Sequence, residues 1–167
     1  MTKNVVENTH YFQALVDAVR DYCLMIEHVS KVESSRWLAD IGRILPRIKA
    51  AMAQFEMPKS EQNHFSLCDL EERFELFCQL RQHLGELDAY WLEYDPDTER
   101  EEMSGSLAGD FADIYFELRR GLNLLDSDAN NQKHALSIWQ SGYMMNWGQR
   151  LMDAEKHIFS LKLAGKL

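Results

Sequence analysis

Two predicted helices in the second half of the chain carry ionisable side chains on shared faces. Asp110 and Asp113 are three residues apart in the first of these helices, and Glu117 lies further along the same face. The last helix presents a second set of polar side chains on one face: Asn146, Arg150, Asp153 and His157. If the two faces meet, they form a pocket of carboxylates with one arginine and one histidine. Metal sites and hydrolytic sites use side chains of these kinds.

A metal site of the helix-bundle type needs more ligands than these two helices supply. Di-metal bundles combine inward carboxylates with two Glu-x-x-His pairs. The comparable pair here is Asp153 with His157, which are four residues apart and have no second copy in the chain. We therefore predict no metal and no cofactor, and we interpret the acidic stripe as solvent-facing, with an ion pair to Arg150. Metal-dependent or hydrolytic chemistry at this stripe with His157 stays an alternative.

The spacing of Arg150 and His157, with six residues between them, suggests a second alternative function. This spacing resembles the R-x(4–6)-H signature of the HEPN superfamily of helical ribonucleases. The resemblance implies that the arginine holds a phosphate while the histidine transfers a proton. Residues 69–128, however, carry five basic and 17 acidic side chains, and this net charge of −12 repels a phosphate backbone. We therefore expect no nucleic-acid partner.

The composition is that of a soluble globular protein. The chain has 167 residues, of which 46% are apolar and 27% charged, and its formal net charge is −9. No apolar run approaches the ~20 residues that a membrane-spanning helix needs, and the first residues do not resemble a signal peptide. Three widely spaced cysteines are predicted to be reduced thiols: Cys23, Cys68 and Cys78. We expect a cytoplasmic protein that does not enter a membrane.

Apolar residues recur at intervals of three and four along nearly the whole chain, which predicts helices and no strand. Five helices are predicted: from Asn8 or Thr9 to about Val29, from Ser34 or Ser35 to the residues before Pro58, from Asp69 to Gly85, from Ser104 or Ser106 to the turn at 126–131, and from about Gln132 to Leu163. Pro46 should kink or split the second helix. Residues 58–68 and 90–105 are predicted to be connecting segments. The prediction is an all-α, single-domain bundle of about five helices over residues 1–167.

Apolar stripes predict which helix faces are buried. The stripe of the third helix comprises Leu70, Phe74, Phe77, Leu80 and Leu84. The stripe of the last helix comprises Ile138, Gly142, Met145, Gly148, Leu151, Ala154, Ile158 and Leu161. Beside it, Trp139, Tyr143 and Trp147 recur every four residues, so the last helix is apolar over a wide arc. We predict that this helix is the packing centre of the bundle.

Three segments, in the same order, resemble the motifs of a bacterial family known only as a domain of unknown function. Residues 104–115, SGSLAGDFADIY, are similar to its "GSLADDLADIY" helix, and the Tyr90-Trp91 and Tyr94-Asp95-Pro96 pieces to the segment before it. Residues 146–157 are similar to its "HWGRH…DALRALH" helix, although Asn146 and Arg150 replace two histidines. The matching positions in the two helices are Asp110, Asp113, Tyr115, Trp147, Gly148, Asp153 and His157. The resemblance implies a small, helical, cytoplasmic protein and no established activity.

The absence of a complete catalytic set favours a non-catalytic binding or protein-interaction module. Its partner is predicted to be a protein, for which a second copy of the chain is one candidate. We assign no catalytic and no metal-ligating residue. The predicted partner surface comprises Trp91, Tyr94, Asp110, Asp113, Tyr115, Trp147, Arg150, Asp153 and His157.

Overall fold

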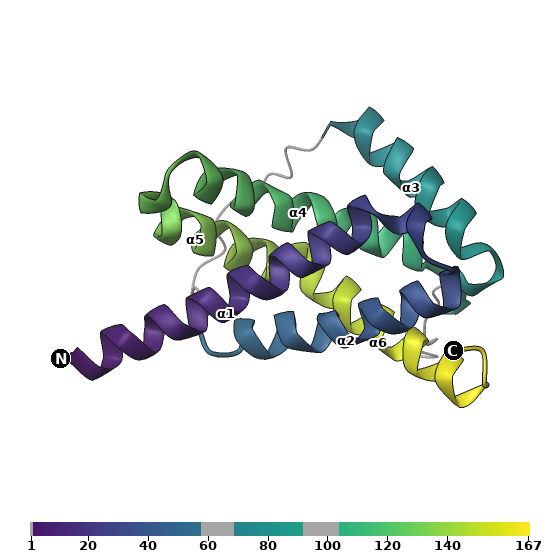
Figure 1. Cartoon of the computed structure of the whole chain (residues 1–167), viewed down its shortest axis with the longest axis horizontal. Helices are drawn as coiled ribbons and strands as arrows, with labels where there is room; N and C mark the ends of the chain where they lie inside the picture. The colour runs from purple at the N-terminus through teal and green to yellow at the C-terminus, as the bar shows by residue number, and fades with distance from the viewer. Residues whose placement is uncertain (1, 58–68, 92–103) are drawn as a thin grey trace, which may run out of the picture.

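The computed structural model describes residues 2–57, 69–91 and 104–167, with side chains from residue 9 onward. Its helices are α1 (Thr2–Glu27), α2 (Ser34–Met52), α3 (Leu70–Leu84), α4 (Leu107–Ser127), α5 (Gln132–Gly142) and α6 (Gly148–Leu163). Two short strands, β1 (Ala89–Trp91) and β2 (Ser104–Ser106), pair antiparallel. Figure 1 shows α4 crossing the middle of the molecule and α3 at its edge. The predicted all-α bundle is confirmed.

Local capping explains where α2, α3 and α4 begin. The predicted starts of the third and fourth helices are confirmed: Asp69 accepts hydrogen bonds from the first turn of α3, and Ser106 accepts one from that of α4. α3 stops at Gly85, which has a φ of 53° that favours glycine. Glu33, rather than a serine, caps α2. Its pKa is lowered to about 2 because the Ser35 hydroxyl and two backbone N–H groups stabilise the carboxylate.

The structure differs from the sequence prediction at two places in the first helices. α1 begins at Thr2 and not at Asn8 or Thr9. α2 continues as one helix through Pro46, so of the predicted kink or split, the split does not occur. A proline removes one backbone hydrogen bond, but Leu45 and Ile48 beside it are fully buried against the neighbouring helices, which holds the helix together.

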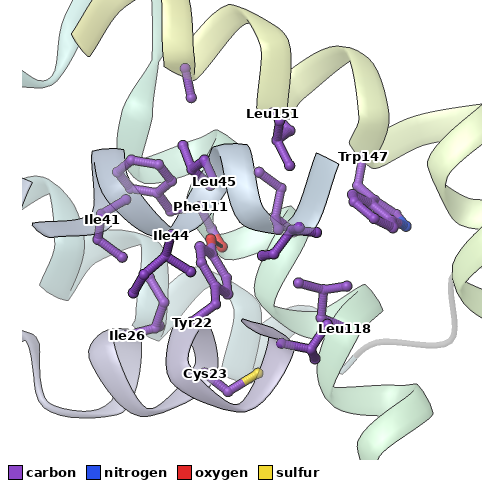
Figure 2. Close-up of a cluster of buried hydrophobic side chains, with 14 of the residues drawn as sticks. Tyr22, Cys23, Ile26, Ile41, Ile44, Leu45, Phe111, Leu118, Trp147 and Leu151 are labelled. Carbon is purple, nitrogen blue, oxygen red and sulfur yellow. Dashed lines mark hydrogen bonds between the residues drawn. The ribbon is translucent and has the colours of Figure 1, made fainter. Parts of the chain in front are cut away.

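The core lies between α1, α2, α4 and α6. Figure 2 shows Tyr22, Ile26, Ile41, Leu45 and Phe111 in this cluster, and all five are fully or almost fully buried. The Tyr22 hydroxyl donates a 2.9 Å hydrogen bond to the Phe111 carbonyl, so the only polar atom of that side chain is satisfied. The core thus ties the first helices to α4, the helix that carries Asp110 and Asp113.

The last helix is not a single regular α-helix. A π-helical turn, Tyr143–Trp147, joins α5 to α6. The wider turn shifts the helical phase, so Trp139 and Trp147 are both fully buried, while Met145 of the predicted stripe is more than half exposed. Gly148 permits this turn because a Cβ there would lie 2.3 Å from the Tyr143 carbonyl oxygen. The predicted stripe is therefore correct after residue 147 and wrong at Met145.

The first half of α3 packs much less closely than its apolar stripe predicted. Leu80 and Leu84 are buried, but Leu70 is 78% exposed and Phe74 62% exposed. The apolar stripe therefore predicted the buried face of α3 correctly only in its C-terminal half. No described helix is both long and apolar enough to span a membrane.

Candidate functional site

Two short strands position the first groups of the site. Residues 90–105 were predicted to be a loop, but the described ends of this segment pair as β1 and β2, with Tyr90 opposite Gly105. A Cβ on Gly105 would lie 2.3 Å from the Tyr90 ring, so only glycine lets the ring lie flat over β2. The pairing places Tyr90 at the start of α4. Tyr94 lies outside the described residues.

Asp88, which the sequence analysis missed, anchors the strand to α4. Its side chain is 4% exposed and accepts hydrogen bonds from the Ala108 backbone N–H at 2.7 Å and from the Ser106 hydroxyl. Its carbonyl oxygen accepts from the Leu107 backbone N–H at 3.0 Å. A carboxylate at this position also complements the positive end of the helix dipole. No sequence signal marked this residue, because its partners lie about 20 positions away.

Behind the strand lies a charged cluster, which we define as Arg73, Tyr90, Asp110, Asp113 and Arg150. Arg150 contacts both carboxylates, with Nη1 3.2 Å from Asp110 Oδ1 and Nε 3.0 Å from Asp113 Oδ2. The Tyr90 hydroxyl donates to Asp110, and the Arg73 guanidinium donates to Asp113. The cluster therefore joins β1, α3, α4 and α6.

The acidic stripe of α4 is not solvent-facing, so that interpretation was wrong. Asp110 is only 5% exposed, and the side chain of Asp113 is 10% exposed. Burial raises the pKa of Asp110 to about 6, although its hydrogen bonds and the Arg150 charge oppose this shift. Burial also raises the pKa of Tyr90, and the hydrogen bond to Asp110 adds to the effect. Tyr90 therefore remains a protonated donor at neutral pH.

A groove of about 630 Å³ opens on the other side of Tyr90, between β1 and α6. It is lined by Ala89, Tyr90, Trp91, Gln149, Asp153, Lys156, His157 and Ser160. The Tyr90 and His157 rings stack with their centroids 4.9 Å apart, and His157 Nε2 donates to the Leu87 carbonyl at 3.0 Å. Asp153 accepts a 3.0 Å hydrogen bond from Gln149. Trp91 is 74% exposed at this groove.

The eight described residues of the predicted partner surface do not form one surface. Three of the described ones line the groove: Trp91, Asp153 and His157. Asp110, Asp113 and Arg150 belong to the charged cluster behind it. Trp147 is fully buried, and Tyr115 donates to Glu27 on α1. Tyr115 and the buried Glu117 line a different cavity of about 640 Å³.

The two catalytic alternatives require side chains that already have protein partners here. Arg150, the phosphate-binding residue of the ribonuclease alternative, is held by two carboxylates and also donates to Asn146. His157 uses Nε2 to donate to a backbone carbonyl. Within the described parts of the chain, no three His, Cys, Asp or Glu side chains gather as a metal site would require.

The fold and the site define an all-helical bundle in which a charged cluster joins the central helix to a short β-hairpin and the last helix. The chain belongs to the family described as DUF5063, a domain of unknown function, whose model matches residues 6–164. The chain is similar in fold to the crystal structure of protein BF1032 from Bacteroides fragilis, with a TM-score of 0.71 and 18% identity over 89% of each chain. No curated protein matches the chain.

Proposed function

We propose that the chain is a cytoplasmic, non-catalytic binding module that holds a segment of a partner protein in the groove between β1 and α6. One observation carries this proposal: an exposed tryptophan, Trp91, lines a groove whose α6 side is polar, with Gln149, Asp153, Lys156, His157 and Ser160. Tryptophan is among the side chains that contribute most to protein interfaces, because it buries a large rigid surface at a small entropic cost.

The charged cluster supports a structural role behind the groove rather than a reactive one. Asp110 and Asp113 each have an arginine partner, and Asp110 also accepts from Tyr90. A general acid or base must reach the substrate. Asp110 instead holds Tyr90 in place, and Asp113 binds the two arginines. Tyr90 in turn stacks on His157, so the cluster shapes the floor of the groove.

The lining of the groove indicates what kind of segment it would accept. Asp153 and Lys156 supply opposite charges on one side, and Trp91 supplies an apolar surface on the other. A peptide with an apolar or aromatic side chain flanked by polar residues fits this combination. Ligand sites in proteins typically combine an apolar surface with a few placed polar groups.

The tryptophans provide a direct test. Trp37, Trp139 and Trp147 are fully buried, so acrylamide quenching should report almost only on Trp91. Peptides selected on the protein from a random phage library should shift the emission to the blue and protect it from acrylamide. Binding measured by calorimetry should weaken about tenfold or more in Trp91→Ala. In the matched control Phe74→Ala, which changes an exposed aromatic side chain that does not line the groove, affinity should not change.

Two results would count against this proposal. Selected peptides that bind Trp91→Ala as tightly as they bind the parent protein would show that the groove is not the binding site. Hydrolysis of RNA or of a phosphate ester that is lost in His157→Ala would show that the protein is an enzyme. Circular dichroism of each variant provides the folding control.

A further inference from the structure

One backbone edge of β1 has no strand partner in the part of the chain that the structure describes. In an antiparallel pair, residues alternate between hydrogen-bonded and non-hydrogen-bonded positions. The Asp88 carbonyl accepts from the Leu107 N–H at 3.0 Å, which sets the order of this alternation. Tyr90 then occupies a hydrogen-bonded position opposite β2, and Ala89 and Trp91 occupy non-hydrogen-bonded positions. The backbone N–H and C=O groups of Ala89 and Trp91 therefore point away from β2.

This outer edge opens on the groove between β1 and α6. All three residues of β1 line the groove, whereas none of the three residues of β2 does. Ala89 and Trp91 are both exposed, and no described residue forms a hydrogen bond with their four outward backbone groups. The groove thus contains two donors and two acceptors that repeat every second residue, as they do along any strand edge.

We propose that the partner segment enters the groove as an extended strand that pairs with the outer edge of β1, an inference that rests on the proposed function and specifies how the groove binds. An unpaired strand edge is a template for another strand, because the backbone groups of an extended chain match its spacing. A helix satisfies its backbone groups internally and cannot pair with this edge. The β1 of a second copy does not fit, because it has β2 on one edge and α6 across the groove from the other.

Strand pairing determines which side chains the segment should carry. Side chains alternate between two faces along a strand, and residues directly opposite each other share a face. The Tyr90 ring stacks on His157, so the segment residue opposite Tyr90 meets the polar side chains of α6, among them Asp153 and Lys156. Trp91 lies on the other face, so the residue opposite it should be apolar or aromatic. The segment is therefore expected to alternate between apolar and polar residues.

Amide hydrogen exchange followed by NMR tests the pairing at the groups that carry it. In the free protein, the Ala89 and Trp91 amides should exchange much faster than the Tyr90 amide, which β2 already holds. A selected peptide whose binding requires Trp91 should slow exchange at Ala89 and Trp91 about a hundredfold at about 100 times its Kd, because exchange then requires dissociation. A scrambled peptide of the same composition is the matched control and should leave both rates unchanged.

Methylation of the peptide amides gives a second test, in which the protein is unchanged. Every second amide of a strand paired with β1 donates to β1, and the amides between them point away. Replacing one peptide N–H at a time by N–CH3 should therefore weaken binding about tenfold or more at alternate positions and less at the positions between them. Calorimetry with the parent protein measures both sets.

Two substitutions at one position separate the backbone contact from the side-chain contact. Trp91→Ala loses the indole ring, whereas Trp91→Pro loses the ring and also the outward N–H. Proline is tolerated on an edge strand where its nitrogen faces away from the neighbouring strand. Trp91→Pro should therefore bind the peptide about fivefold more weakly than Trp91→Ala, or weaker still. Circular dichroism and slow exchange of the Tyr90 amide show that the helices and the hairpin remain intact.

Three results would overturn strand pairing while the proposed function stands. The first is a peptide that requires Trp91 for binding but leaves exchange at Ala89 and Trp91 as fast as in the free protein. The second is a methylation scan without alternation. The third is slow exchange of these two amides in the free protein, which would show that the edge is already paired, and light scattering would then show whether a second copy pairs with it. If no selected peptide requires Trp91, the proposed function and this inference both fail.

Discussion

The two sides of α4 are stabilised in different ways. One side packs Phe111, Ile114 and Leu118 into the apolar core. The other side buries Asp110 and Asp113 against arginines that come from α3 and α6. Apolar contacts depend mainly on the area that is buried and little on direction. Buried charges need particular partners in particular places, because an uncompensated charge is costly.

This contrast explains why the charged side determines the shape of the groove. Tyr90 lies over Gly105 and donates to Asp110, so its ring can occupy only a narrow range of positions. The apolar side sets the stability of the bundle, and the charged side sets the position of the hairpin relative to α6. Substitutions on the two sides of α4 should therefore affect the free energy of unfolding to different extents, and only those on the charged side should make it depend on pH.

The largest effect is expected on the apolar side. Phe111→Ala removes a fully buried ring and leaves a cavity, which should lower the free energy of unfolding by about 4 kcal/mol. Urea denaturation followed by circular dichroism measures this value. The control Phe74→Ala changes a mostly exposed ring and should cost less than about 0.5 kcal/mol. Equal effects in the two variants would contradict the assignment of Phe111 to the core.

A smaller, pH-dependent effect is expected on the charged side. The pKa of Asp110 rises from 3.8 to about 6 on folding, so the folded state binds this proton more tightly. The contribution of the protonated Asp110 carboxyl to the free energy of unfolding is therefore complete below about pH 4 and is lost as the pH rises through about 6. A shift of about two pKa units corresponds to up to about 3 kcal/mol.

Urea denaturation of the parent protein and of Asp110→Asn over this pH range measures the contribution. The difference in the free energy of unfolding, parent minus variant, should decrease by up to about 3 kcal/mol between about pH 4 and pH 7. A difference that is constant with pH, or that increases, would show that Asp110 is not a buried carboxyl with a raised pKa.

The smallest of the three effects is expected at Arg150. Arg150→Met leaves Asp110 and Asp113 close together without their shared cation. Because the guanidinium side chain is 39% exposed, we expect a loss of only about 2 kcal/mol in the free energy of unfolding. The control Arg43→Met breaks the exposed ion pair with Asp40 and should cost less than about 0.5 kcal/mol. The melting temperatures of the two variants compare the loss of a largely buried ion pair with the loss of an exposed one. Equal decreases in melting temperature would contradict the expectation that Arg150 contributes more to stability than Arg43.

Much of the bundle could be predicted because apolar periodicity is a local signal. The helix starts at Asp69 and at Ser104 or Ser106 were predicted from residues only a few positions apart. The π-helical turn before Gly148 was missed, because only the packing of Trp139 and Trp147 requires it. The hairpin was missed for a similar reason: three-residue strands are too short to show an alternating pattern.

The candidate site was predicted in part. The spacing of Asp110 and Asp113 predicted a shared face, and that face meets Arg150 as the charged-pocket hypothesis required. The spacing could not show that Arg73 and Tyr90 complete the cluster, since they are 40 and 20 residues away from their carboxylate partners. His157 and Asp153 line the groove rather than the cluster.

The sequence by itself determined the helical class, most helix boundaries and the residues that can carry charge, because these properties depend on neighbours within a few turns. Only the tertiary structure decided which of those charges are buried. Burial depends on segments far apart in the chain meeting at one place, and that meeting raises the pKa of Asp110 and leaves Trp91 exposed at the groove.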